Sequence, residues 1–369
     1  MTYFVQAHEK CDGRTLWLYS RAPRSYTFTE DLPPLPPSTP SRRWHELRGE
    51  WVYYNAARNN RTFNPPAEYN PLAPVQPGAF PGEIPVTDFE VAVFDNRFPG
   101  LKLDMLDAGD GAGNAGDAGG TGNENAGGTG NKTEGGGPLP ATGHCEVVVY
   151  STQDHGSLAD FSDDHVALLL DAWGHRVDQL QARGAIAYVL PFENRGAEIG
   201  TTLPHPHGQI YAFGHIPPII ERQARNQAET QAIQRQLDQP KSHVAAHGHV
   251  RTLVPQFARY PFETWIISPE LGPSPSAWQS TKLDMAKALK AAIRRLDTLF
   301  DCPMPLVMWV ATAPRGFAET WPCHIQIYPF LRGPGRLKYL ASVEQMTGLM
   351  LSDVLPETAV ETLRNLDIT

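Results

Sequence analysis

The sequence lacks the features that mark secreted, membrane and nucleic-acid-binding proteins. Its four cysteines (Cys11, Cys145, Cys302 and Cys323) lie far apart and never at Cys-x-x-Cys spacing, so neither a disulfide framework nor a cysteine zinc site is indicated. No apolar run could span a bilayer, and the N-terminus lacks the basic and apolar regions of a secretion signal. The net charge of -9 disfavours binding to a nucleic-acid backbone. We expect a cytoplasmic protein that binds neither membranes nor nucleic acids.

Two stretches are poor in the residues that build a core. Residues 107–137 are almost wholly Gly, Asn, Ala, Asp and Thr, so they bury too little to offset their ordering entropy, and we expect a disordered insertion. Residues 33–37 read P-P-L-P-P, which predicts an extended segment. We assign residues 1–41 to an N-terminal extension that wraps over the surface or reaches a partner. The remaining length of the 369-residue chain is enough for two domains.

The most informative stretch is residues 202–213, T-L-P-H-P-H-G-Q-I-Y-A-F, which predicts a turn leading into a strand. Because strand side chains alternate between faces, we expect His205, His207 and Gln209 to share one face. Imidazole is a nucleophile near neutral pH, and an amide donates to a phosphoryl oxygen. The pattern therefore fits a phosphoryl or nucleotidyl group carried on histidine, with two packed core histidines as the alternative.

The second half of the chain repeats the first. Aligned without a gap, Phe262–Ser268 matches Cys145–Ser151, and His324–Tyr328 matches His207–Tyr211. A helix predicted over 162–183 then matches one over 281–300, for which Ser280 is a possible cap, and a strand over 185–190 is followed by its counterpart over 304–310. Each half is thus a strand, helix, strand, strand unit, and we expect the halves to pack as a pseudo-dimer. Cys323-His324 replaces Pro206-His207, so the second half is expected to keep the architecture without the chemistry.

Other elements connect these units. Residues 42–54 predict a strand, and residues 217–239 predict one polar helix between the halves. His243, His247 and His249 follow this helix without a nearby carboxylate or thiolate, so we expect a solvated loop rather than a metal site.

The motif Phe192-Glu193-Asn194-Arg195-Gly196, followed by Gly200 and the histidine strand, resembles the signature of the galactose-1-phosphate uridylyltransferases, the transferase branch of the histidine-triad superfamily. The resemblance runs from about Arg42 to Asp353. It implies an α+β fold of duplicated histidine-triad-like halves, 42–215 and 216–369, with two antiparallel sheets and helices packed on them. It also implies a homodimer.

The resemblance implies transfer of UMP from UDP-glucose to galactose-1-phosphate in galactose metabolism, through a uridylyl group on His207. Gln209 would donate to a non-bridging phosphate oxygen, and a backbone carbonyl near His205 would hold the ring of His207. One alternative is a nucleotidyl phosphorylase or adenylyltransferase acting on an ADP-sugar or a dinucleoside polyphosphate. Another is a nucleotide-binding homologue without turnover.

The resemblance also implies substrate contacts elsewhere in the chain. Arg58 and Arg61 would reach the nucleotide phosphates, often across a dimer interface, although both also fit solvated surface charges. The nucleoside would meet Asn96 and Phe98, and the hexose-1-phosphate would meet Lys338 and Glu344. The remaining candidates for substrate binding are Asn194 and Thr202. Val343 and Met350 stand where relatives have polar hexose contacts, so the sugar is left open.

Two metal sites of the family lack ligands here. Asn70 and Ala73 occupy the positions of a Cys-x-x-Cys pair, which leaves His155 and His205 as remnants of a zinc site. Val310 and Gln326 replace two of the three histidines of an iron site, of which only His324 remains. We therefore expect no metal cofactor.

Overall fold

The computed structural model describes residues 3–29, 32, 34–60, 69–76, 82–103 and 137–368. Arg61 and residues 107–136 of the predicted insertion lie outside this part of the chain. None of the helices that are described is both long and apolar enough to cross a membrane.

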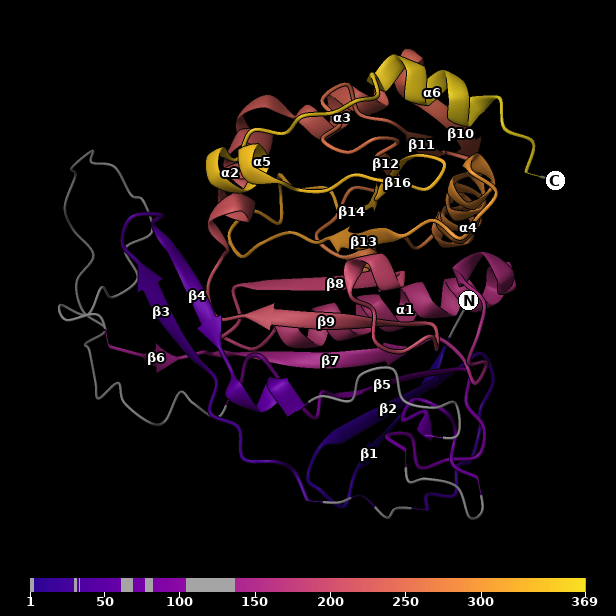
Figure 1. Cartoon of the computed structure of the whole chain (residues 1–369). Helices are drawn as coiled ribbons and strands as arrows, with labels where there is room; N and C mark the ends of the chain where they lie inside the picture. Colours follow the sequence, from indigo (N-terminus) through magenta and orange to yellow (C-terminus); the bar gives the residue numbers. More distant parts are fainter. Residues whose placement is uncertain are drawn as a thin grey trace.

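One antiparallel sheet of eleven strands runs through the molecule (Figure 1). We predicted two antiparallel sheets, but the halves share one main sheet, because β8 pairs with β13 at its centre, with Phe192 opposite Trp309 and Arg195 opposite Leu306. The α+β class and the antiparallel arrangement are confirmed. In spatial order the strands are β1 (Phe4–Glu9), β2 (Thr15–Ser20), β5 (Val91–Asp95), β7 (Gly143–Val149), β9 (His207–Phe213), β8 (Tyr188–Arg195), β13 (Leu306–Ala311), β14 (His324–Pro329), β12 (Thr264–Ile267), β11 (Val250–Leu253) and β10 (His243–His247).

Two long helices form the layer that covers one face of this sheet (Figure 1). Helix α1 (Asp163–Gln181) begins where Ser162 accepts a hydrogen bond from the backbone N–H of His165, and it buries Leu169, Trp173 and Val177. Helix α4 (Lys282–Leu299) packs against α1 and buries Leu289 and Leu296. Its N-cap residue is Thr281 rather than the predicted Ser280, and both residues donate hydrogen bonds to Glu270.

The internal repeat is present, with a one-residue correction. His207 lies opposite Val149, and its counterpart His324 lies opposite Ile267. The ungapped alignment placed Ile266, not Ile267, under Val149, so the predicted register of β12 is wrong by one residue. Between equivalent ladder positions the second half is one residue shorter, because Phe192 follows Val149 by 43 positions whereas its counterpart Trp309 follows Ile267 by 42. A one-residue shift exchanges the two faces of a strand. Trp265 consequently lies on the same face as Gln326.

The remaining segments differ from the predictions in local detail. The predicted strand over 42–54 is a hairpin that turns at Gly49, where φ is +65°. The polar helix over 217–239 is interrupted at Gln231, which has φ +50°. His243 and His247 lie in β10, so the predicted loop is wrong for them. The stretch assigned to an N-terminal extension supplies β1 and β2 of the main sheet.

The other elements are β3 (Ser41–His45), β4 (Glu50–Tyr54), β6 (Leu139–Pro140), α2 (Pro218–Thr230), α3 (Ala232–Leu237), β15 (Leu331–Gly333), β16 (Arg336–Leu337), α5 (Ser342–Thr347) and α6 (Pro356–Arg364). The short 3-10 helices are η1 (Ala56–Asn60), η4 (Leu158–Asp160), η5 (Ala197–Ile199), η6 (Pro240–Ser242) and η7 (Pro275–Ala277).

Candidate active site

His207 is the first residue of β9, an interior strand hydrogen-bonded to β7 and β8. Its Nδ1–H donates to the carbonyl oxygen of His205 at 2.8 Å, which leaves the lone pair on Nε2. No partner for Nε2 is found among the described residues. Burial lowers the pKa of His207, and the bond to the carbonyl offsets this only in part. The ring is therefore neutral near pH 7, with Nε2 available as a nucleophile.

His205 is buried in the turn that precedes β9, so it does not extend from the strand face that carries His207 and Gln209 as we predicted. Its Nε2–H donates to the carbonyl oxygen of Ser151 at 2.8 Å, and its Nδ1 accepts from the side-chain amide of Asn70 at 3.0 Å. With both ring nitrogens bonded, His205 contributes its backbone carbonyl to the site, while its side chain anchors the turn.

A cleft of about 450 Å³ opens beside these histidines. The predicted residues Asn194, His205 and His207 all line it, and Thr202 does not, although its neighbour Thr201 does. The hydroxyl of Thr201 donates to the carbonyl oxygen of Asn194 at 2.9 Å, which ties the loop after β8 back to the strand. The lining consists of Gly156, Glu193, Asn194, Arg195, Gly196, Ala197, Thr201, Leu203, Pro204, His205, Pro206 and His207.

A buried pair, Tyr150 and Glu193, lies against β9 next to His207 and was missed in the sequence. The hydroxyl of Tyr150 donates to Glu193 at 3.0 Å, and both side chains are buried. Gly208 lies directly against this pair, because a Cβ there would stand 2.5 Å from the Tyr150 hydroxyl and 2.8 Å from the carbonyl oxygen of Phe192. Burial raises the pKa of Glu193 to about 7, against the opposing effects of Arg195 and Tyr150. The only sequence signal was the position of Glu193 within the Phe-Glu-Asn motif.

Arg58 extends from η1 to the face of β9 that carries His207, Gln209 and Tyr211. Its guanidinium donates to the hydroxyl of Tyr211 at 3.1 Å and to the carbonyl oxygen of Phe98 at 3.2 Å. Tyr211 lies two residues beyond Gln209 and therefore on the same face. The side chain of Asn96 accepts from the backbone N–H of Phe98 at 2.8 Å, which fixes the turn after β5. Arg58, Asn96 and Phe98 thus form one group near the far end of β9.

Lys338 and Glu344 are not brought to the cleft within a single chain. They form an ion pair with each other at 2.5 Å, with side chains only 7% and 6% exposed. Neither residue lines the cleft that contains His207.

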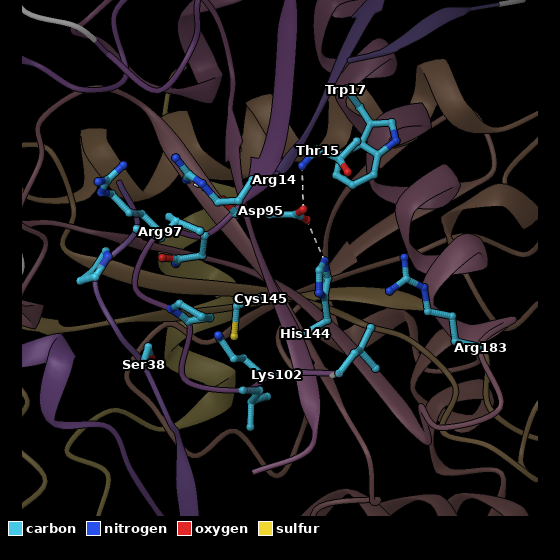
Figure 2. Close-up of a pocket in the computed structure, with 16 residues that line it drawn as sticks. Arg14, Thr15, Trp17, Ser38, Asp95, Arg97, Lys102, His144, Cys145 and Arg183 are labelled. Atoms are coloured by element: carbon cyan, nitrogen blue, oxygen red, sulfur yellow. Dashed lines mark hydrogen bonds and ion pairs between the residues drawn. The ribbon is translucent and has the colours of Figure 1, made fainter. Parts of the chain in front are cut away.

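A second cavity, of about 360 Å³, lies where β5 ends and β7 begins, with Asp95 and His144 in its lining (Figure 2). Asn96 also lines it. Beside it, His144 lies 2.9 Å from Asp95 and 3.3 Å from Glu146, and Arg176 pairs with Glu146 at 2.6 Å. Burial would lower the pKa of His144, but the hydrogen bonds to the two carboxylates outweigh it and raise the pKa to about 9. Burial would raise the pKa of Glu146, yet Arg176 and His144 hold it at about 2.

Asp95, His144 and Glu146 are the one His/Asp/Glu group close enough to hold a metal within the part of the chain that the structure covers. Their carboxylates already face the cations of His144 and Arg176. We therefore interpret the group as an ion-pair network that fixes the ends of β5 and β7.

The residues at the family's two metal positions do not fit a metal ion. At the zinc position, the amide of Asn70 occupies Nδ1 of His205, while the side chain of His155 is 84% exposed and bonded to Asp154. At the iron position, the amide nitrogen of Gln326 donates to Nε2 of His324 at 2.8 Å. Neither set offers the open donor atoms that a closed metal shell requires. The absence of a metal cofactor stays a prediction.

Comparisons with known proteins agree with this geometry. Residues 137–217 match the family "Galactose-1-phosphate uridyl transferase, N-terminal domain". The chain is 29% identical to a galactose-1-phosphate uridylyltransferase of Thermotoga maritima over 341 residues, covering 88% of this chain and 98% of the relative. It is 27% identical to that of Rattus norvegicus over 354 residues, covering 87% and 86%.

Solved structures share the fold. A uridylyltransferase structure has a TM-score of 0.69 at 23% identity and covers 88% of this chain and 97% of its own. An ADP-glucose phosphorylase from Arabidopsis thaliana with bound ADP-glucose has a TM-score of 0.65 at 19% identity, covering 90% and 100%. The likeness in sequence and the likeness in fold therefore both extend over nearly nine tenths of the chain.

Proposed function

We propose, from the premise that this chain is a relative of the galactose-1-phosphate uridylyltransferases, that it transfers UMP from UDP-glucose to galactose-1-phosphate through a uridylyl group on His207. The observation that carries the proposal is the hydrogen bond between His207 Nδ1 and the carbonyl of His205, which fixes the neutral ring of a residue that lines the cleft and leaves the lone pair on Nε2. The relatives in Thermotoga maritima and Rattus norvegicus bear the name of this activity.

In the first step, the lone pair of His207 Nε2 forms a bond to the α-phosphorus of UDP-glucose. The bond from that phosphorus to the bridging oxygen breaks, and its electrons leave with glucose-1-phosphate. The ring becomes cationic as the bond forms, and the carbonyl of His205 stabilises this charge through Nδ1–H. A phosphate oxygen of galactose-1-phosphate then attacks the same phosphorus, and the neutral ring leaves. The two displacements predict ping-pong kinetics.

Other side chains have supporting roles in this proposal. Gln209 lies on the face of β9 that carries His207. In this proposal its amide would donate to a non-bridging phosphate oxygen, and loss of such a donor typically costs roughly a hundredfold in rate. Arg58 would meet the nucleotide phosphates. Asn96 and Phe98 would meet the nucleoside. Asn194 and Thr202 would position the substrate.

We also propose that the enzyme acts as a homodimer. Lys338 and Glu344 do not line the cleft of their own chain, so their proposed contact with the hexose requires the cleft of a partner or a rearrangement of the C-terminal segment. Arg61 is proposed for the same interface as Arg58. The likeness to relatives places the reaction in galactose metabolism, and we propose a cytoplasmic enzyme.

The direct test is the intact mass of the protein after brief incubation with UDP-glucose, measured for the wild type, for His207→Gly and for His249→Gly. His249 is exposed and serves as the matched control. We expect a gain of one uridylyl group in the wild type and the control, and none in His207→Gly. An adduct with an ADP-sugar alone would move the assignment to adenylyl transfer. The absence of any adduct despite nucleotide binding would favour a binding protein.

A further inference from the structure

In the second half of the chain, His324 keeps the Nδ1 hydrogen bond that His207 makes, but its Nε2 is also hydrogen-bonded. Nδ1–H of His324 donates to the carbonyl oxygen of Pro322 at 2.9 Å, as His207 does to His205. Nε2 of His324, however, accepts from Gln326, whose oxygen accepts in turn from Tyr328 at 2.5 Å and from Trp309 at 3.2 Å. Burial lowers the pKa of His324 to about 4. The histidine is therefore neutral and blocked.

Above this blocked histidine lies a separate cavity of about 250 Å³, roofed by α2 and α3. It occupies the face of β12 and β14 that corresponds, in the repeat, to the face of β7 and β9 that carries His207. Four aromatic side chains line it, namely Phe257, Trp265, Trp321 and Tyr328. Such walls favour a flat ring.

Within the described residues, two polar side chains of the lining have a group without a hydrogen-bond partner. The side-chain oxygen of Gln223 is buried and has no hydrogen-bond partner within the described residues. Arg259 is half-buried, and its guanidinium makes no hydrogen bond or ion pair with any residue that the structure describes. The neighbouring carboxylate, Glu263, accepts hydrogen bonds from the backbone N–H groups of Arg259 and Tyr260 and from the indole of Trp265. The charge of Arg259 also acts on this carboxylate and opposes the rise in its pKa that burial causes. The cavity thus offers one acceptor and one cation to a ligand.

We propose that this cavity binds a nucleoside monophosphate at a second, non-catalytic site. The base would lie against the aromatic side chains and donate an N–H to Gln223, and the phosphate would pair with Arg259. The site does not use His207, so it goes beyond the proposed transfer reaction. The blocked His324 accounts for binding without chemistry.

Tryptophan fluorescence can report this site selectively, because Trp265 and Trp321 line the cavity whereas the described lining of the catalytic cleft contains no tryptophan. We would titrate the wild type with UMP and with AMP, and in parallel with uridine and inorganic phosphate. We expect saturable quenching by at least one monophosphate, with weaker binding of the two fragments. The variants Gln223→Leu and Arg259→Met should each weaken this binding about tenfold or more.

Arg235→Met on the exposed face of α3 is the matched control and should bind as the wild type does. Mass analysis after UDP-glucose should show that the formation of any His207 adduct is unchanged in both cavity variants. Quenching that persists in both variants, or no quenching by UMP and AMP at millimolar concentration, would overturn the proposal. If the variants do not fold, calorimetry on the wild type decides: binding confined to sites that leave tryptophan fluorescence unchanged also overturns it.

Discussion

The side-chain amide of Asn70 lies 3.0 Å from Nδ1 of His205 and donates to it, across 135 residues of sequence. This bond fixes the turn whose carbonyl holds the ring of His207. Asn70→Ala leaves a buried ring nitrogen without a donor, and we expect a loss of about 1 to 3 kcal/mol in the free energy of unfolding.

Urea unfolding of Asn70→Ala beside Asn365→Ala, an exposed residue at the end of α6, measures this effect. Adduct formation should also slow in Asn70→Ala, because the carbonyl of His205 loses its fixed position. Equal stability of the two variants would contradict the role that we assign to Asn70.

Gly208 has no room for a side chain. A Cβ at this position would meet the Tyr150 hydroxyl at 2.5 Å and a backbone oxygen at 2.8 Å, so we expect Gly208→Ala to destabilise the fold by about 1 to 3 kcal/mol and to reduce adduct formation. The double variant Gly208→Ala/Tyr150→Phe removes one of the two clashes and should recover part of the loss. Gly184→Ala, where the added Cβ would meet nothing within 4 Å, is the control. No recovery in the double variant would mean that the backbone contact alone sets the cost.

The rate of uridylylation should depend on pH through His207. Its pKa is lowered from an ordinary value of 6.5, and only the neutral ring can attack, so the rate should stay high as the pH falls to 6.5 and decline only below that. Rapid-quench single turnovers from pH 5 to pH 8 measure this profile. An apparent pKa at or above 6.5 would contradict the burial argument. Because Glu193 titrates near 7 beneath the same strand, Glu193→Gln should be measured in parallel to separate the two groups.

Glu193 should make the fold less stable as the pH rises. Its pKa is raised from 4.5 to about 7, so the native state binds the proton more tightly than the unfolded state, and stability falls between these two values and levels off above them. A pKa shift of this size corresponds to a loss of roughly 3 kcal/mol in the free energy of unfolding. Glu193→Gln lacks this penalty, so its stability relative to the wild type should improve by about that amount from pH 4.5 to pH 8. The exposed Glu198→Gln should show no such change when both are unfolded in urea.

Local pattern was enough to predict the elements that carry the site. The helix expected over 162–183 spans Asp163–Gln181, and the strand expected after the histidine turn is β9. The spacing of apolar residues shows which face of a segment is buried. Because the helix is long and the strand is strongly patterned, both could be predicted in this way. The strand, helix, strand, strand repeat also followed from residues alone.

Contacts between distant segments could not be predicted in this way. The joining of the halves depends on the pairing of β8 with β13, and the support of His207 depends on the contact of Tyr150 with Glu193, 43 residues away. The one-residue shift of β12 arose because its ladder position lies one residue closer in sequence to that of β13 than the ladder position of β7 lies to that of β8, which no periodicity encodes. Tertiary packing decides each of these features, and a single sequence shows only the local part of it.

The position of β9 between β7 and β8 has a consequence for hydrogen exchange. An interior strand exposes its amides only when a large part of the sheet opens, so we expect slow exchange in β9, which carries His207. His205 lies outside the strand, in a turn held by two side-chain bonds, and its neighbourhood can open locally at lower cost. His207 is therefore carried by an interior strand, whereas the carbonyl that sets its tautomer belongs to a turn whose amides we expect to exchange faster.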